Sequence, residues 1–383
     1  MKSNNIIELL GETILPGESK TIEVEIAKLH TMTKLKIPII IERSKIEGPV
    51  VLFSAGLHGD EINGTEIVRQ LIIRKINKPK CGTIICIPII NIFGFVNQSR
   101  QFPDGRDLNR VFPGSKNGSL ASRFAHFLVK DVIPIVDYAV DFHAGGASRF
   151  NAAQIRVVPN NTELKELAKV FNAPFTLYSK NIQGSFRNAC TRLGVKMLLF
   201  EGGKSLDLNA EITQEGVDGA KRFLAHLDML NPKKEANFTY DETLFIKKSN
   251  WIRANFSGMF IGLVKAGSFV NKGDILATIS DPFGKVSHKL KAPHAGYLIN
   301  VNDAPIGLAI TSTEVEEAQA IGTVVGDLST TDVDAGDTHT YSLVAGAGST
   351  DNAQFTIVGN QLQTNAIFDL SLKSTYKVRI QTT

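Results

Sequence analysis

Strand-like apolar runs alternate with helical patterns along residues 21–237, and this alternation constrains the fold more than any other feature. The predicted strands are Lys36–Ile41, Val50–Ala55, Thr83–Ile90, Ala139–His143, Gln154–Val158 and Met197–Glu201, and the predicted helices are Glu61–Lys75, Ser119–Lys130, Thr162–Phe171, Ser185–Leu193 and Ala210–Leu227. Such alternation is typical of an α/β domain whose largely parallel sheet lies between helices. Ligands bind these sheets outside the carboxyl ends of the strands. We therefore expect functional side chains at those ends.

Length and composition indicate a folded protein of more than one domain. The chain has 383 residues, of which 43% are hydrophobic and 21% are charged, as in ordinary globular proteins. A chain of this length suggests two or three domains. Its formal net charge of +4 is small for its length, so charge gives no case for a nucleic-acid partner.

The N-terminus and the cysteines both favour a cytoplasmic protein. The apolar stretch Ile6–Leu10 is too short for a signal peptide, and no segment approaches the length of a membrane span. Cys81, Cys86 and Cys190 lack the spacing of a zinc ribbon and cannot form a disulfide framework. We expect buried, reduced thiols and no membrane partner.

A candidate metal motif directly follows the predicted strand Val50–Ala55. In Gly56-Leu57-His58-Gly59-Asp60-Glu61, the side chains of His58 and Glu61 can both turn toward one ion, and imidazole nitrogen and carboxylate oxygen suit zinc. A third ligand, His143, closes another apolar run. Three protein ligands leave zinc one position for a water molecule, which the ion activates as a nucleophile. The alternative is that His58 is a surface-turn histidine and His143 a core histidine.

Two further features suit a hydrolase. Glu201 ends an apolar strand before two glycines, where a carboxylate could serve as the base that a zinc hydrolase requires; the alternative is a helix cap or a loop ion pair. The segment Ser99–Gly114 is rich in Arg, Asp, Asn and Gly and lacks apolar periodicity, which indicates a loop. Its arginines could polarise a carbonyl or grip a carboxylate, although Asp104, Arg106 and Asp107 could also brace the loop.

The sequence pattern changes twice after the predicted α/β domain. Short strands punctuated by glycine begin near Glu242 and resemble the small barrel-sandwich of biotinyl and lipoyl carrier domains, but no carrier lysine follows a methionine at the expected tip. From Gly307, Thr, Ser, Asp, Ala and Gly dominate, and acidic turns such as Asp332–Asp337 resemble those of a cadherin-like repeat. We predict a catalytic domain at 1–240, a small β-domain at 241–306 and a cadherin-like β-sandwich segment at 307–383.

Four motifs together resemble the succinylglutamate desuccinylase/aspartoacylase family, a branch of the zinc carboxypeptidase superfamily. They are Gly56–Glu61, Asp107-Leu108-Asn109-Arg110, Asp141-Phe142-His143 and Glu201-Gly202-Gly203, and the likeness covers about residues 20–305. The resemblance implies a mixed sheet flanked by helices and one Zn²⁺ per chain. It also implies roles for particular residues: zinc ligation by His58, Glu61 and His143, general acid/base catalysis by Glu201, carbonyl polarisation by Arg100, and substrate binding by Asn109, Arg110 and Arg187.

The sequence departs from the family near residue 306, where relatives continue into a closing strand and this chain enters the cadherin-like segment. We interpret this as a fusion. The leading functional hypothesis is a zinc-dependent amidohydrolase that removes the acyl group from a small N-acyl amino acid; the protein could also form a homo-oligomer. The alternatives are a zinc carboxypeptidase acting on peptides and a non-catalytic binding or adhesion protein with a degenerate hydrolase core.

Overall fold

The structure is a computed structural model that describes residues 6–28, 30–147, 149–230, 242–283, 285–302, 308–310, 312, 314–330, 340–345 and 348–382. The chain divides into two compact units, residues 1–303 and 304–383, and we describe each by itself. The predicted boundaries near residues 240 and 306 and the acidic turn Asp332–Asp337 lie outside the described residues. The division into three domains therefore stays a prediction.

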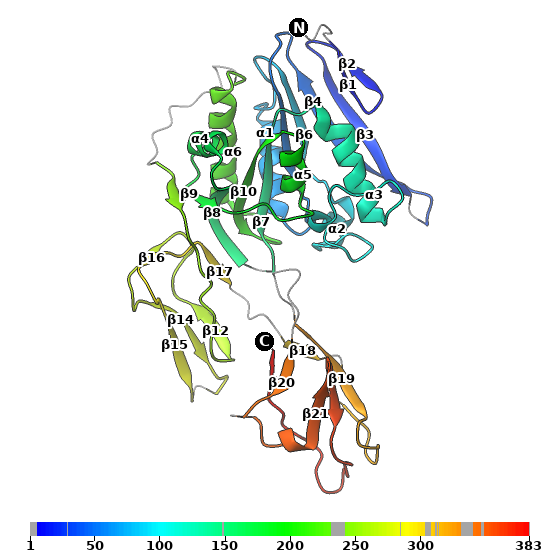
Figure 1. The fold of residues 1–383 in the computed structure, drawn as a ribbon, viewed down its shortest axis with the longest axis vertical. Helices are drawn as coiled ribbons and strands as arrows, with labels where there is room; N and C mark the ends of the chain where they lie inside the picture. The colour runs from blue at the N-terminus through cyan, green and yellow to red at the C-terminus, as the bar shows by residue number, and fades with distance from the viewer. Residues whose placement is uncertain are drawn as a thin grey trace. The chain divides into compact units, whose positions relative to one another are not determined.

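A mixed sheet forms the centre of the first unit (Figure 1). Its strands are β3 (Ser19–Lys28), β4 (Lys34–Arg43), β5 (Val50–Ala55), β6 (Thr83–Ile87), β7 (Tyr138–Gly145), β8 (Arg149–Val157), β9 (Phe175–Tyr178), β10 (Lys196–Lys204), β11 (Leu244–Ile246) and β17 (Asn300–Asn302). Their order is β11-β9-β8-β10-β7-β5-β6-β4-β3, with β17 also paired to β8. The neighbours β6, β5, β7 and β10 run parallel, whereas β4 and β8 pair antiparallel on either side of them. The predicted parallel arrangement is thus confirmed for the centre of the sheet, and its flanks make the sheet mixed.

Helices cover both faces of this sheet. They are α1 (Ile62–Ile73), α2 (Ile92–Asn97), α3 (Leu120–Phe127), α4 (Thr162–Phe171), α5 (Phe186–Arg192) and α6 (Ala210–His226). Successive strand residues point to opposite faces, and β5 follows this rule: Val51 and Phe53 join the core under α1, α4 and α6, while Leu52 joins the core under α3 and α5. The sheet is therefore buried on both sides, which explains why its central strands are continuous apolar runs.

Local side-chain chemistry sets where the helices begin. The hydroxyls of Ser119 and Ser185 accept hydrogen bonds from the first turns of α3 and α5, and the amides of Asn161 and Asn209 do the same for α4 and α6, which satisfies backbone donors that a helix start leaves unpaired. The predicted bounds of α4 are confirmed. The helix predicted at Ser119–Lys130 is α-helical only as far as Phe127. A π-helical turn, Leu128–Val132, follows it directly. A short 3₁₀ turn, Ile133–Ile135, precedes β7, and another, Leu108–Arg110, lies in the predicted loop.

Small sheets complete the first unit. A hairpin of β1 (Ile7–Leu9) and β2 (Glu12–Ile14) lies near the N-terminus. After β11 follow β12 (Met259–Gly262), β13 (Phe269–Val270), β14 (Ile275–Ser280), β15 (Ser287–Lys291) and β16 (Gly296–Tyr297). They form a three-stranded sheet, β12-β14-β15, and a pair, β13-β16, around Val270, Leu276 and Ala292. This β-rich segment (residues 244–302) also contributes β11 and β17 to the large sheet.

The second unit is built of antiparallel strands. They are β18 (Leu308–Ile310), β19 (Val324–Thr330), β20 (Tyr341–Leu343), β21 (Phe355–Val358), β22 (Gln361–Thr364) and β23 (Ile380–Thr382). One sheet has the order β18-β19-β22-β21 and the other pairs β20 with β23, and Val325, Phe355, Leu362 and Phe368 form a small core. The cadherin-like assignment stays a prediction. Across the described parts of both units, no helix is long and apolar enough to cross a membrane.

Candidate metal centre

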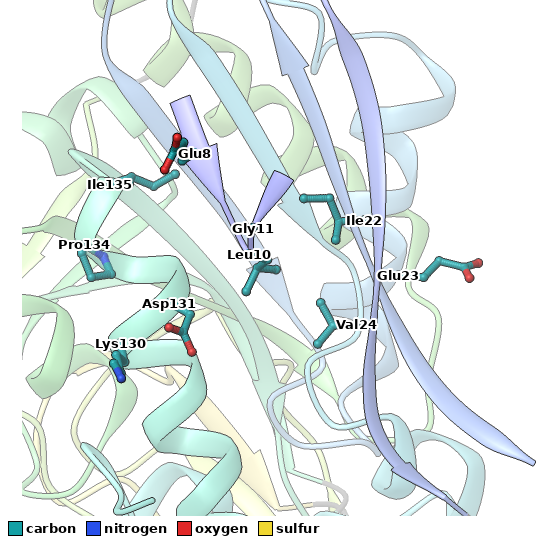
Figure 2. Close-up of a pocket in the computed structure, with 10 residues that line it drawn as sticks. All are labelled: Glu8, Leu10, Gly11, Ile22, Glu23, Val24, Lys130, Asp131, Pro134 and Ile135. Carbon is teal, nitrogen blue, oxygen red and sulfur yellow. The ribbon is translucent and has the colours of Figure 1, made fainter. Parts of the chain in front are cut away.

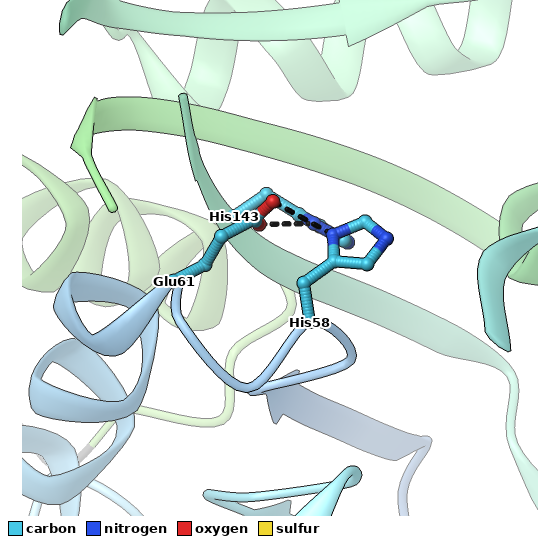
Figure 3. Close-up of side chains that lie close together, drawn as sticks. All are labelled: His58, Glu61 and His143. Atoms are coloured by element: carbon cyan, nitrogen blue, oxygen red, sulfur yellow. Dashed lines mark hydrogen bonds and ion pairs between the residues drawn. The ribbon is translucent and has the colours of Figure 1, made fainter. Parts of the chain in front are cut away.

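The three predicted metal ligands lie together at the carboxyl ends of β5 and β7 (Figure 3). His58 is in the loop after β5, Glu61 directly precedes α1, and His143 is near the end of β7. One ligand atom from each lies within 4.8 Å of the others. Nδ1 of His58 is 2.7 Å from Glu61 Oε1, and Nδ1 of His143 is 2.7 Å from Glu61 Oε2. All three side chains are buried.

Two glycines allow this close arrangement. A Cβ atom at Gly59 would lie 1.9 Å from the backbone carbon of Gly94 in α2, and one at Gly64 would lie 2.3 Å from the carbonyl oxygen of Phe142. No side chain fits at either position without moving the backbone. Because Gly59 lets the loop press against α2 and Gly64 lets α1 press against β7, these glycines bring Glu61 within reach of His143.

A second carboxylate holds each imidazole. Nε2 of His143 lies 2.8 Å from Asp141 Oδ2, and Asp141 in turn accepts a hydrogen bond of 2.6 Å from the Ser54 hydroxyl. Nε2 of His58 lies 3.1 Å from Asp107 Oδ1. When each Nε2–H donates to its carboxylate, each Nδ1 faces Glu61 and is available to bind a metal ion. Proteins usually orient metal-binding histidines through such a hydrogen bond from the other ring nitrogen. Two oriented imidazole nitrogens and a carboxylate oxygen fit a zinc ion.

The electrostatics of the group favour a cation. Burial opposes ionisation of Glu61, but the positive charges of His58 and His143 and their hydrogen bonds hold its pKa well below the usual value. Burial likewise opposes charge on His143, yet the Asp141 and Glu61 carboxylates raise its pKa well above the usual value. The carboxylates that stabilise positive charge on the imidazoles would equally stabilise a metal cation among them.

Replacing Asp141 with alanine should weaken zinc binding about 10- to 100-fold, because His143 would lose the partner that fixes its orientation. Zinc affinity can be measured by competition with a chelating dye. The matched control is Asp131→Ala, which removes an aspartate far from the metal group in the π-helical turn. An affinity for zinc that is unchanged in Asp141→Ala would contradict the orienting role.

The loop that contains the predicted substrate-binding residues also borders the metal group. Arg100 donates through Nη1 to Glu61 Oε1 at 3.1 Å and through Nε and Nη2 to Asp107 Oδ2 at 3.2 and 2.9 Å. Arg110 bonds the carbonyl oxygen of Asn109 at 3.0 Å, and the Asn109 side-chain oxygen accepts from the backbone N–H of Phe186 at 2.8 Å. The structure therefore brings Arg100 to the metal group, while Asn109 fastens the loop to α5.

Glu201 lies in register with the metal group on the same sheet face. In β10 it pairs with His143 of β7 and with Gln154 of β8, and residues paired across strands project from the same face. Its Oε2 accepts a hydrogen bond from Asn151 Nδ2 at 3.0 Å, and its Oε1 lies 3.8 Å from Arg156 Nη1. The buried amide of Gln154 has no hydrogen-bond partner among the described residues. Sequence reasoning missed Asn151, Gln154 and Arg156, which only the strand pairing places beside Glu201.

Arg187, the last predicted substrate residue, lies in the first turn of α5, and its side chain is buried. Its guanidinium donates to the Ser179 hydroxyl and to the carbonyl oxygens of Arg156 and Lys180. Burial and the nearby charge of Arg156 lower the pKa of Arg187 to about 10. These bonds tie α5 to β8 and to the end of β9. A contact with substrate stays a prediction for this residue.

A groove of about 590 Å³ lies elsewhere in the first unit (Figure 2). The hairpin β1-β2, the edge strand β3 and the turn before β7 line it, and its polar groups are Glu8, Glu23, Lys130 and Asp131. It includes none of the metal-group residues and no histidine. The groove therefore adds nothing to the chemistry of the metal group.

Comparison with known proteins points to one family. The sequence profile of the succinylglutamate desuccinylase/aspartoacylase catalytic domain matches residues 47–227. A relative from Halomonas elongata, N-alpha-acetyl-L-2,4-diaminobutyric acid deacetylase, is 27% identical over an aligned length of 259 residues, and the match covers 64% of this chain and 74% of that protein. His58, Glu61, His143 and Glu201 all lie within the matched range.

Solved structures share the fold. The product-bound ectoine utilization protein EutE (DoeB) from Ruegeria pomeroyi has a TM-score of 0.66 at 23% identity, covering 79% of this chain and 95% of that chain. A succinylglutamate desuccinylase/aspartoacylase from Rhodobacter sphaeroides has a TM-score of 0.62 at 24% identity, covering 73% and 89%. At these identities the likeness establishes the α/β fold with its added β-rich segment.

Proposed function

We propose that this protein is a zinc-dependent deacylase, because residues 47–227 match the sequence profile of the succinylglutamate desuccinylase/aspartoacylase catalytic domain. Its substrate would be a small N-acyl amino acid, whose amide bond is hydrolysed. N-acetylated amino acids are the first candidates, because the Halomonas elongata relative is named a deacetylase of N-alpha-acetyl-L-2,4-diaminobutyric acid.

One observation carries the proposal: a buried His-Glu-His group stands beside a carboxylate on the same sheet face. His58, Glu61 and His143 form the group, and Glu201 is in register with His143 on the neighbouring strand. A hydrolase of this kind needs a metal ion and a separate base within reach of the same water molecule. Neighbouring strands lie about 4.8 Å apart, and this short spacing supports the proposal that the metal ion and the base act on one water molecule.

Different residues of the chain would carry out the separate steps of the hydrolysis. Zinc, when bound by His58, Glu61 and His143, supplies a Lewis acid that makes water nucleophilic at neutral pH. Glu201 accepts the proton of the attacking water and returns it to the departing amine. Arg100, held at the edge of the group by Glu61 and Asp107, stabilises the negative charge that develops on the carbonyl oxygen.

The substrate carboxylate is proposed to bind next to this reaction centre. Arg110, half-buried in the same loop, offers a guanidinium fork that matches a carboxylate. Asn109 holds the loop against α5 through the backbone N–H of Phe186. Binding of the substrate carboxylate therefore depends on the packing of the loop on α5 as well as on the charge of Arg110.

A zinc carboxypeptidase is the second candidate, because the same ligands would serve peptide hydrolysis. A non-catalytic binding or adhesion protein is a third, motivated by the β-rich second unit. The intact set of metal-ligand side chains beside Glu201 argues against a degenerate core. Cytoplasmic localisation and a homo-oligomeric state are further proposals from the sequence.

A substrate panel should separate these candidates. We expect the zinc-loaded protein to release amine from N-acetyl or N-succinyl amino acids, including N-alpha-acetyl-L-2,4-diaminobutyric acid, and to leave peptides with a free carboxyl terminus intact. Amine release can be followed with a fluorogenic reagent, and zinc per chain by elemental analysis. Cleavage of peptides alone would favour a carboxypeptidase. Absence of bound zinc, with a melting temperature that responds only to Ca²⁺, would favour the binding protein, because cadherin repeats bind this ion through carboxylates from separate turns.

A further inference from the structure

A chain of hydrogen bonds connects Glu201 to the β-rich segment. Nδ2 of Asn300 in β17 donates to Oδ1 of Asn151 in β8. Nδ2 of Asn151 then donates to Oε2 of Glu201 in β10 at 3.0 Å. Asn300 is 149 residues from Asn151 in sequence and lies beyond residue 227, where the family match to the catalytic domain ends.

Backbone pairing holds the two asparagines opposite each other. In the pairing of β17 with β8, Asn300 is the register partner of Asn151, and the backbone N–H of Ala152 donates to the carbonyl oxygen of Ile299 at 2.9 Å. On its other side, Asn151 is the register partner of Gly203 in β10. The register shifts between Glu201 and Gly203, and such an irregularity bends a strand and redirects a side chain. Asn151 bridges this irregularity to reach Glu201.

The bonds also fix which way the Asn151 amide points. A side-chain amide has a donor end and an acceptor end. Because Asn300 donates to the oxygen of Asn151, the amide nitrogen must face Glu201. The opposite orientation would put the Asn151 oxygen against the carboxylate of Glu201, without a donor between them. Asn151 is only 3% exposed, so water does not substitute freely for either partner.

We propose that Asn151 and Asn300 are positioning residues for Glu201. Asn151 holds the carboxylate directly, and Asn300 acts through Asn151 by fixing its orientation. The β-rich segment thereby takes part in catalysis through one side chain, in addition to packing on the sheet. This inference rests on the proposed function, because it assumes that Glu201 is the base.

A double-mutant cycle tests the proposal on the full-length, zinc-loaded protein. With the best substrate of the panel, Asn151→Ala should lower kcat about 10- to 100-fold and Asn300→Ala about 3- to 10-fold, within the range that a base contributes, while KM changes less than about twofold. The double variant should match Asn151→Ala alone, because Asn300 has nothing left to orient. Val301→Ala is the matched control. It trims the neighbouring residue of β17 without touching the hydrogen bonds, and its kcat should stay within about twofold of wild type.

Several results would overturn the inference. They are an unchanged kcat in Asn151→Ala, an unchanged kcat in Asn300→Ala, or effects of the two variants that simply multiply in the double variant. Melting temperature and zinc content accompany each measurement. If Asn300→Ala does not fold, Asn300→Leu keeps most of the side-chain volume but cannot donate, and it should show the same loss of kcat.

Glu201→Gln, measured in parallel, separates this inference from the proposed function. If Glu201→Gln keeps wild-type activity, the proposed base is wrong and the positioning role fails with it. If Glu201→Gln is inactive while both asparagine variants keep wild-type kcat, the proposed function stands and only the positioning role is wrong.

Discussion

Replacing Glu201 with glutamine should lower kcat/KM about 10³-fold or more, while zinc remains bound at about one ion per chain. Glutamine has nearly the same shape, and its side-chain oxygen can still accept the hydrogen bond that Asn151 donates to Glu201. What it lacks is a basic oxygen to take the proton of the attacking water. The measurement combines steady-state kinetics on an N-acyl amino acid with elemental analysis of the same sample. A large loss of rate at full zinc content would assign proton transfer to this carboxylate.

The matched control for this variant is Glu166→Gln. Glu166 lies on α4, where it is exposed and pairs with Lys169. Its replacement removes the same charge far from the metal group and should leave kcat/KM within about twofold of wild type, as is usual for surface sites. A zinc-replete Glu201→Gln protein with wild-type kinetics would refute the role of the base. A variant that has lost its zinc would instead point to a structural effect on the neighbouring His143.

The sequence was sufficient for the central α/β fold, because the signals involved are local. The apolar run Val50–Ala55 became β5 with the predicted bounds, and the amphipathic pattern of Thr162–Phe171 became α4. The amphipathic periodicity of a helix and the apolar run of a buried strand need no knowledge of distant contacts. Strands β3 and β9 were not predicted. In β3, half-buried and exposed positions alternate at the edge of the sheet, and the alternation of Ile22, Val24 and Ile26 with polar residues is a local signal that could have predicted this strand.

The candidate site was only partly predictable, for a similar reason. His58, Glu61, His143 and Glu201 could be singled out because each follows or ends a recognisable strand. The residues that orient these side chains could not be identified from the sequence. Asn151 reaches Glu201 only because β8 pairs with β10, and nothing in single-strand patterns predicts that order. Asp141, by contrast, could have been recognised as a partner of His143. The two residues have an i, i+2 spacing in one strand, which puts both side chains on the same face.

Loss of a metal ligand is the second change from which we expect a large effect on activity. Replacing His143 with alanine should reduce bound zinc from about one ion per chain to below about 0.1, because a catalytic zinc site rarely survives with two protein ligands. Glu61 would also lose one of the two imidazoles that its carboxylate contacts. Activity should fall at least about 10³-fold, since water would no longer be activated by a metal ion. Elemental analysis after gel filtration and an activity assay give the two readouts.

His226→Ala is the matched control, because His226 is an exposed histidine at the end of α6. Its zinc content and activity should equal those of wild type. A chelation experiment sharpens the comparison. Wild-type protein stripped of metal should regain activity when zinc is added, whereas His143→Ala should not regain it at the same zinc concentration. Full zinc content with full activity in His143→Ala would mean that the ion binds elsewhere. Loss of activity at full zinc content would instead show that His143 acts on the substrate rather than on the metal, so the pair of readouts decides which chemistry this histidine performs.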